Sequence, residues 1–326
     1  MPVSAAVTDR LAAIANLKIF FEEPLARHTR FGIGGPAAVF CDAPDEDGCA
    51  EALRVSERMG LPRVIMGAGT NLIVSDAGFD GVVIRYTGAG IERKGDTLRV
   101  QAGAVLQDVV DRSISWCLKG LETMTGIPGY LGGAVYGNAG AYGHSIQELV
   151  ITVSATNGEC IKAFRNEDCR FRYRDSIFKD QKEWVILSAE LRFTAGDAAE
   201  LANAAAGIRT IRDAKYPPTM KCAGSIFKNL MYADLPASVQ TEIPVKLVRE
   251  GKVPSAWFLE QAGVKGIRRG DIQVATYHAN LIYNDGAGTA ADLVEVIQDL
   301  KRRVKDRFGF ELEEEVQYVG FEYATA

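Results

Sequence analysis

The sequence predicts an α+β protein built from more than one domain. Helix and strand signals alternate through the first part of the chain, and an Asn157-Gly158 dipeptide separates two strand-like runs. An alanine-rich helix then precedes a second α+β part. Asn-Gly between two such runs is the strongest short hairpin signal. The chain has 326 residues, which is the length of two or three domains.

The first predicted helix covers residues 45–59, where Ala50, Leu53 and Met59 recur at roughly helical spacing. A second helix is expected over residues 105–118. Short apolar runs predict buried strands over residues 63–66, 72–76, 82–86 and 97–102.

The predicted hairpin begins with a strand over residues 149–154, and a strand over residues 184–193 completes a β-rich section. The alanine-rich helix then runs from Gly196 to about Arg212. It ends before Pro217, because the residue before a proline is disfavoured in the α region.

The clearest element of the last part is a helix over residues 290–308 with one apolar face. Thr289 can cap its start, and Gly309 can end it. A strand is expected over residues 310–321, and residues 230–253 show little periodicity, which predicts a surface excursion.

The composition is that of a soluble globular protein, with 47% hydrophobic and 24% charged residues. A net charge of −5 and the absence of a Lys/Arg block argue against a nucleic-acid partner. The six cysteines show no zinc spacing and are expected to be reduced and mostly buried. The three isolated histidines predict no metal site. No secretory pattern or membrane-spanning window is found, which predicts a cytoplasmic protein without membrane insertion.

The most unusual segment is the glycine-dense run over residues 126–143, which also carries large apolar side chains and three tyrosines. Glycine costs backbone entropy, so a dense run indicates unusual dihedral angles or a backbone that approaches a ligand closely. A flexible linker would instead be rich in Gly and Ser. We therefore expect an ordered, buried loop whose amides face a large, flat, phosphate-bearing ligand.

A second glycine-rich turn, Gly67-Ala68-Gly69-Thr70-Asn71, directly follows a predicted strand. Successive amides in such a turn can form an anion-binding nest. The turn is not a Rossmann fingerprint, because a third glycine is missing and a strand follows, and it is not a P-loop. Alone, a plain structural turn explains it better; beside the run over residues 126–143, a ligand loop is favoured.

Two polar clusters could carry chemistry, and each also has a structural explanation. Arg174 near a strand end offers a permanent cation and a planar donor fork, but from the sequence alone a surface arginine paired with Asp175 explains it better. Ser225 directly follows Gly224 and could be a positioned hydroxyl near Lys228, or a capping or turn serine.

A third polar cluster is the acidic run over residues 311–315. On a strand, its alternating pattern is typical of a solvated or edge-protecting acidic face. Nothing in the spacing singles out Glu315.

In their order along the chain, these segments resemble the UDP-N-acetylenolpyruvoylglucosamine reductase family, flavoenzymes of bacterial peptidoglycan synthesis. The resemblance covers the chain from about residue 24 to residue 321. It is carried by six motifs: Thr29–Gly35, Gly67–Asn71, Gly126–Gly143, Tyr173–Ser176, Gly224–Asn229 and Leu312–Gly320.

The resemblance implies a vanillyl-alcohol-oxidase-type FAD-binding fold with two subdomains, over residues 1–86 and 87–198. A C-terminal α+β substrate-binding domain would follow over residues 199–326 and carry Glu315 on its last strand. The short interval between Arg174 and Ser225 is similar to that of the subgroup without a tyrosine-bearing substrate loop. Residues 230–253 are longer than is usual in the family.

The resemblance also implies the site residues. Arg174, Ser225 and Glu315 match the catalytic trio. Non-covalent FAD binding is implied for Gly67, Ala68, Gly69, Thr70, Asn71, Gly126, Ile127, Pro128, Gly132, Gly133, Ala134, Asn138, Gly140 and Ala141. Substrate binding is implied for Tyr173, Lys228 and Asn229.

The implied reaction reduces the enolpyruvyl ether of UDP-N-acetylglucosamine to UDP-N-acetylmuramate, with NADPH as co-substrate in the same cavity. A hydride goes from reduced FAD to the methylene carbon, and Ser225 protonates the α-carbon. Arg174 and Glu315 would act on the substrate carboxylate, and Lys228 would favour the serine alkoxide. The implied partners are a sugar nucleotide and NADPH, and a monomer is favoured.

Two other functions stay open at this point. One is a sugar or lactone oxidase on the same flavin fold; such enzymes often tether flavin through His or Cys, and His144 is the only nearby candidate. The other is a sugar-nucleotide binder that has lost its flavin.

Overall fold

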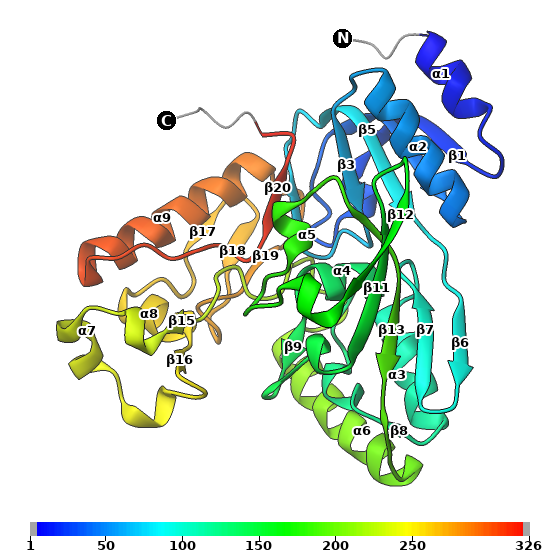
Figure 1. Cartoon of the computed structure of the whole chain (residues 1–326). Coiled ribbons are helices and arrows are strands. Elements are labelled where there is room, and N and C mark those ends of the chain that lie inside the picture. The colour runs from blue at the N-terminus through cyan, green and yellow to red at the C-terminus, as the bar shows by residue number, and fades with distance from the viewer. Residues whose placement is uncertain (1–4, 322–326) are drawn as a thin grey trace. The chain divides into compact units, whose positions relative to one another are not determined.

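The computed structural model describes residues 5–321, which form two compact units (Figure 1). Unit 1 holds the described residues up to Glu23, together with Ala37–Gly69 and Phe79–Ala214. Unit 2 holds Pro24–Pro36, Thr70–Gly78 and the described residues from Lys215 onward. The chain thus changes unit at Lys215 instead of at residue 199, and two short N-terminal segments belong with the C-terminal part. Within residues 5–321, none of the helices combines the length and apolarity that a membrane crossing requires.

The first sheet of unit 1 has four strands in the order β1-β2-β5-β3. Strands β2 and β3 both pair in parallel with β5. The strands are β1 (Lys18–Pro24), β2 (Pro36–Ala43), β3 (Arg63–Met66) and β5 (Phe79–Tyr86). The helices of this part are α1 (Ala5–Ala12) and α2 (Glu46–Arg58). Helix α2 confirms the helix predicted over residues 45–59, and the Asp45 carboxylate caps it by accepting from the Gly48 N–H at 2.7 Å.

The second sheet of unit 1 has five antiparallel strands in the order β12-β11-β13-β7-β6. These are β6 (Ile91–Lys94), β7 (Thr97–Gln101), β11 (Val150–Thr156), β12 (Ile161–Arg165) and β13 (Val185–Arg192). The predicted hairpin is confirmed, because β11 pairs with β12 around Asn157 and Gly158. The Asn157 side chain accepts from the N–H groups of Glu159 and Cys160, and Gly158 takes a φ of +90°.

Unit 1 also contains the helices α3 (Leu106–Ser115), α4 (Leu131–Tyr136), α5 (Ile177–Asp180) and α6 (Ala198–Lys215). Two short antiparallel pairs join β8 (Leu118–Lys119) to β14 (Thr194–Ala195), and β9 (Gly140–Ala141) to β10 (His144–Ser145). Single 3₁₀ turns lie at η2 (Glu122–Met124), η3 (Ile146–Glu148) and η4 (Asn166–Cys169). Helix α6 is the predicted alanine-rich helix, and it ends before Pro217 as expected.

Unit 2 is built around a three-stranded antiparallel sheet with helix α9 against it (Figure 1). The strands are β17 (Arg268–Arg269), β18 (Ile272–Val274) and β19 (Ile282–Asn284), and α9 spans Ala290–Phe308. Two further pairs join β4 (Leu72–Val74) to β20 (Gln317–Val319), and β15 (Leu230–Met231) to β16 (Lys252–Val253). The remaining helical segments are η1 (Leu25–His28), η5 (Tyr232–Asp234), α7 (Ala237–Glu242), η6 (Val245–Leu247) and α8 (Ser255–Gln261).

Helix α9 has the bounds and the caps that the sequence predicts. The Thr289 hydroxyl accepts from the Asp292 N–H at 3.1 Å, and Gly309 ends the helix at a φ of +79°. The structure adds a second cap: the Asp76 carboxylate accepts from the N–H groups of Ala290 and Ala291 at 2.8 and 3.0 Å. A carboxylate at this end also interacts favourably with the helix dipole.

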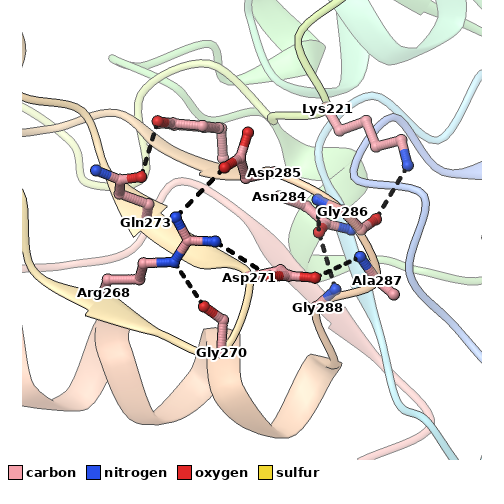
Figure 2. A network of polar contacts seen from close by, with 11 residues as sticks. Lys221, Arg268, Gly270, Asp271, Gln273, Asn284, Asp285, Gly286, Ala287 and Gly288 are labelled. Carbon is pink, nitrogen blue, oxygen red and sulfur yellow. Dashed lines mark hydrogen bonds and ion pairs between the residues drawn. The ribbon is translucent and has the colours of Figure 1, made fainter.

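A polar network organises the turn between β19 and α9 (Figure 2). The Asn284 side chain accepts from the Gly286 and Gly288 N–H groups at 3.1 and 2.9 Å. The Asp271 carboxylate accepts from the Ala287 N–H and from Arg268. These contacts hold the pKa of Asp271 below its usual range, chiefly through the Ala287 N–H. The network therefore supports the fold at the start of α9.

Two predictions for unit 2 were wrong in part. The strand expected over residues 310–321 is limited to β20 and an isolated β-bridge between Glu314 and Phe227. The side chains of Glu311, Glu313 and Glu314 form ion pairs with lysines. Residues 230–253 are more than a surface excursion, since they supply four buried apolar side chains to the core of unit 2. These side chains are Leu235, Val239, Ile243 and Val253.

The prediction that the cysteines are mostly buried was confirmed. Four of the cysteines are buried, whereas Cys117 and Cys160 are exposed, and all six are free thiols.

Candidate functional site

The glycine-rich segment over residues 126–143 contains a helix where a loop was expected. Helix α4 forms because Leu131, Ala134 and Val135 bury one apolar face. The N–H of Leu131 donates to Ala104 O, and that of Gly132 donates to Ala102 O. Several amides of the segment are thus used inside unit 1, and the prediction of a loop with its amides turned to a ligand was wrong for α4.

The two glycine-rich segments meet at Tyr130. A Cβ atom on Gly67 would lie 3.7 Å from the Tyr130 ring, so the turn after β3 packs against the segment that leads into α4. Both Gly67 and Gly126 are half-buried. Unit 1 therefore brings together two of the motifs that were assigned to one ligand.

Gly133 lies outside the packed side of α4. It is exposed, and a Cβ atom there would meet no atom of the described chain within 4 Å. Its neighbour Gly132 differs, because a Cβ would lie 2.9 Å from the Ala102 Cβ. Gly132 is thus required by packing inside unit 1, whereas packing does not require a glycine at Gly133.

Arg174 lies in a tight turn beside the same segment. Arg172 and Asp175 exchange two backbone hydrogen bonds of 3.1 Å, and Arg174 takes a φ of +57° between them. Its guanidinium donates to Gly140 O at 3.0 Å and lies over the ring of Tyr173, with 5.3 Å between the guanidinium carbon and the ring centroid. Arg174 is half-buried and aimed at the glycine-rich segment, which a plain surface arginine would not be.

Two further contacts fix this turn. The Asn138 side-chain amide donates to Arg172 O at 2.8 Å and to Gln147 at 3.0 Å. Lys179 donates to Arg174 O at 2.6 Å. Asn138, expected to bind the cofactor, thus also ties the glycine-rich segment to the turn that carries Arg174.

In unit 2, Ser225 lies on an extended segment held from both sides. Ser225 forms a β-bridge with Leu281, and the Ile226 N–H donates to Asn280 O at 3.2 Å. On the other side, the Glu315 N–H donates to Ile226 O at 2.7 Å, and Phe227 forms a bridge with Glu314. Ser225 and Glu315 are therefore on neighbouring backbone segments.

Buried Asn280 holds the backbone of the Ser225 segment at Phe227, and the sequence did not predict this role. It is 2% exposed, and its side chain both accepts from Phe227 N–H and donates to Phe227 O, each at 2.9 Å. It also donates to the Ser255 hydroxyl at 2.7 Å. A buried side-chain amide needs such partners, since an unpaired one is costly. The sequence held no local signal for it, because its partners lie 25 and 53 residues away.

Glu315 is half-buried and fixed by its backbone on both sides. The Asn71 side chain donates to Glu315 O at 2.9 Å, and the Gln317 N–H donates to Asn71 O at 3.0 Å. Asn71, expected to bind the cofactor, thus uses its side-chain N–H in unit 2 to hold Glu315.

The predicted substrate residues have their own contacts. Lys228 forms an ion pair with Glu313, and Asn229 accepts from the Ser255 N–H at 3.4 Å. The Ser225 hydroxyl lies 3.1 Å from the hydroxyl of Tyr216, a residue to which sequence analysis gave no role.

The predicted site residues therefore form one group in each unit. Unit 1 brings Arg174 and Tyr173 together with residues 126–143 and Gly67, and unit 2 brings Ser225, Lys228 and Asn229 together with Glu315 and Asn71. His144 is exposed and pairs with Glu148 at 2.9 Å. Two surface cavities of unit 1, of about 270 and 300 Å³, contain none of the predicted site residues. Within residues 5–321, no cluster of His, Cys, Asp and Glu could hold a metal ion.

Two family models match the chain. Residues 36–159 match the FAD binding domain, and residues 216–319 match the C-terminal domain of UDP-N-acetylenolpyruvoylglucosamine reductase. The second range contains Ser225 and Glu315 and lies within unit 2.

Curated relatives are similar along almost the whole chain. A UDP-N-acetylenolpyruvoylglucosamine reductase of Solibacter usitatus is 54% identical over 311 residues, which cover 95% of this chain and 100% of the relative. A reductase of the same name from Rubrobacter xylanophilus is 35% identical and covers 92% of this chain and 95% of its own. The crystal structure of the reductase from Thermus caldophilus superposes with a TM-score of 0.72 at 26% identity, covering 93% of this chain and 99% of that one.

The matched domains define a flavin-dependent oxidoreductase with an FAD-binding domain and a C-terminal domain of the reductase type. FAD is its cofactor. Because a relative is 54% identical over 95% of this chain, the chain belongs to the UDP-N-acetylenolpyruvoylglucosamine reductase family.

Proposed function

We propose that this protein reduces UDP-N-acetylglucosamine enolpyruvate to UDP-N-acetylmuramate in peptidoglycan synthesis, with NADPH as reductant. The observation that carries the proposal is the placement of Arg174, whose guanidinium is held against the glycine-rich segment by the Gly140 carbonyl. A planar cation beside a flavin-binding segment suits a substrate that carries a carboxylate next to the bond to be reduced.

The cofactor binds without a covalent tether in this proposal. The space at Gly133 and the packed turn at Gly67 accommodate the flavin, and His144 is engaged with Glu148. When bound, FAD supplies the hydride chemistry, taking a hydride from NADPH and giving it to the methylene carbon of the substrate. Residues of the chain then bind, orient and protonate.

Arg174 grips the substrate carboxylate. Hydride addition leaves negative charge on the α-carbon and the carboxylate, and preorganised donors stabilise such charge best. The turn between Arg172 and Asp175 and the bond to Gly140 O fix the guanidinium before substrate arrives. Tyr173 supports the arginine with its ring and borders the substrate.

Ser225 delivers the proton to the α-carbon. A hydroxyl is a weak acid, but an enolate-like carbon is a strong base, so position matters more than acidity. The bridges to Leu281 and the contact between Ile226 and Glu315 hold the serine backbone in place. Glu315, on the neighbouring segment, polarises the carboxyl group of the substrate, and Lys228 and Asn229 contact the sugar nucleotide.

Rapid mixing without oxygen tests the proposal in two half-reactions. NADPH should bleach the flavin absorbance, and UDP-N-acetylglucosamine enolpyruvate should restore it. UDP-N-acetylglucosamine, which lacks the enolpyruvyl group, is the matched control and should restore nothing. In deuterated solvent, deuterium should enter the product at the α-carbon through the proton transfer. A flavin that NADPH reduces but the enolpyruvyl substrate does not reoxidise would refute the proposed substrate.

A further inference from the structure

Tyr216 lies beside the serine to which the proposed function gives the proton-donating role. The two hydroxyl oxygens are 3.1 Å apart, and either group could be the donor. Tyr216 directly follows Lys215, the last residue of α6. The contact with Ser225 therefore joins the two ends of the loop over residues 216–225. Both residues belong to unit 2 and both are half-buried.

The ring of Tyr216 is held by neighbours on several sides. It packs on the apolar core of unit 2 and lies edge-on to His278, with ring centroids 6.2 Å apart. The Lys215 ammonium lies 5.0 Å from the centroid of the same ring. Pro217 follows directly and restricts the backbone on that side. The phenol oxygen therefore reaches Ser225 from a constrained side chain.

We propose that Tyr216 is a positioning residue for Ser225, an inference that rests on the proposed function. A serine side chain has three staggered χ1 positions, and its hydroxyl proton rotates freely. Ser225 has only one proton to give. If Ser225 donates to Tyr216, that proton points away from the α-carbon. If Tyr216 donates its own O–H and the serine oxygen accepts, the serine proton is left to point to the α-carbon.

The same contact serves after the proton has moved. The Ser225 O–H bond breaks, a C–H bond forms at the α-carbon of the substrate, and an alkoxide is left on Ser225. The Tyr216 O–H, already directed at this oxygen, stabilises the alkoxide until solvent returns a proton. A hydrogen bond to a charged group is stronger than one to a neutral group, so the contact stabilises the state after transfer more than the state before it.

The arrangement of Lys228 supports the assignment to Tyr216. Lys228 was expected to favour the alkoxide of Ser225, but its ammonium forms an ion pair with Glu313. The Ser225 hydroxyl forms its hydrogen bond with Tyr216. The structure thus favours the tyrosine over the lysine as the group that acts on the serine oxygen.

A double-mutant cycle tests this inference. Tyr216→Phe keeps the ring that packs beside His278 and removes only the hydroxyl. We expect flavin reoxidation by the enolpyruvyl substrate to slow roughly 10- to 100-fold, as for loss of a hydrogen bond to a charged group. Flavin reduction by NADPH should stay unchanged. The solvent deuterium isotope effect on reoxidation should rise, because proton transfer becomes more rate-limiting, and a structural defect alone would not raise it.

The cycle is completed by Ser225→Ala and by the double variant. If Tyr216 acts through Ser225, Tyr216→Phe should cause no further loss in the Ser225→Ala enzyme. Tyr283→Phe is the matched control, since this tyrosine of the same unit donates to Gln273 at 3.0 Å and should not alter either half-reaction. The melting temperatures of Tyr283→Phe and Tyr216→Phe should be close to each other.

The outcomes separate this inference from the proposed function. A slow Ser225→Ala enzyme with a normal Tyr216→Phe enzyme would overturn the role of Tyr216 and leave the proton donor in place. Losses that multiply in the double variant would also overturn it, because Tyr216 would then act independently of Ser225. A Ser225→Ala enzyme with wild-type reoxidation would refute the proposed proton donor, and with it a role of Tyr216 through that serine.

Discussion

The two units hold their candidate catalytic residues in different ways. In unit 1, Arg174 has a φ of +57° in a turn that two backbone hydrogen bonds close, and its guanidinium donates to Gly140 O. In unit 2, Ser225 and Glu315 lie on extended backbone segments that pair with each other and with Leu281. Unit 1 thus fixes a side chain at its end, and unit 2 fixes the backbone from which side chains project.

This difference predicts how each unit responds to substitution. Truncation of Ser225 should leave the frame of unit 2 intact, because Asn280 and the backbone bridges hold it without the serine hydroxyl. Truncation of Arg174 removes a contact to the glycine-rich segment together with the cation. Changes in unit 1 should therefore affect flavin and fold as well as chemistry, and changes at Ser225 should affect chemistry alone.

The largest effect is expected at Gly133. Gly133→Leu should remove flavin from the purified protein, because its side chain would fill the open space that we assign to the cofactor. The helical backbone should accept it, since leucine has a better helix propensity than glycine. Absorbance at the flavin bands measures occupancy, and melting temperatures are compared on flavin-stripped proteins because bound ligand adds stability.

Two matched glycine variants sharpen this test. Gly207 in α6 also has no atom within 4 Å of a Cβ position, so Gly207→Leu should keep its flavin. Gly132→Ala should lower the melting temperature of the stripped protein, because its Cβ would approach Ala102 to 2.9 Å. Full flavin occupancy in Gly133→Leu would show that this side of α4 does not line the cofactor.

Ser225→Ala should give the next largest effect, confined to one half-reaction. Loss of a positioned general acid typically slows a step by about 10²–10⁴. Flavin reoxidation by the enolpyruvyl substrate should fall by that order, and flavin reduction by NADPH should stay near wild type. A matching loss in both half-reactions would mean that the serine supports the structure of unit 2 instead of donating a proton.

Arg174→Ala should slow reoxidation by about 10²–10³, the usual cost of losing one preorganised donor to a developing negative charge. Alanine and arginine are both L-residues, so the strain at a positive φ is similar in the two proteins. Arg174→Lys keeps the charge but loses the planar fork, and it should recover part of the rate. The comparison of the two units predicts some loss of flavin in Arg174→Ala. If the variant keeps all its flavin and both half-reactions slow equally, Arg174 does not act by binding the substrate carboxylate.

Local patterns predicted part of the fold, including helices α2, α3, α6 and α9. Helix α9 and the hairpin β11–β12 were confirmed because their signals, a capped apolar face and an Asn-Gly turn, lie within the element itself. Helix α4 was not predicted, because Gly132 and Gly133 are poor helix formers and interrupt its apolar pattern. The contacts of its first turn with Ala102 O and Ala104 O come from a distant segment of the chain. The strand over residues 310–321 was over-extended, because acidic alternation also fits a coil whose glutamates pair with lysines.

The site was predictable only as separate motifs. The residue types at Arg174 and Ser225 suggested chemistry, but their partners Gly140 and Tyr216 lie 34 and 9 residues away and no spacing rule connects them. Asn280 and Asn71 act through backbone groups of distant residues, and a pattern of side chains does not reveal such contacts. The roles of the trio came from the family resemblance and stay predictions until the half-reactions are measured.

The smallest effect is expected from His278, and it concerns the pH dependence of stability in unit 2. Burial, together with the nearby charges of Lys215 and Lys265, lowers the pKa of His278 from 6.5 to about 4. Its buried Nε2 has no hydrogen-bond partner among the described residues, so a protonated ring would leave an unpaired N–H inside the protein.

The sign of the effect follows from proton binding in the two states. Between pH 6.5 and pH 4 the unfolded chain holds a proton on this histidine and the folded chain does not. The contribution of His278 to stability is therefore fully present above pH 6.5 and declines as the pH falls toward 4. His278→Gln removes the titrating group, so the melting temperature of the variant should fall less steeply over this range than that of the wild type. Carboxylates titrate in both proteins and cancel in the comparison, and identical slopes would show that His278 already has an ordinary pKa in the folded protein.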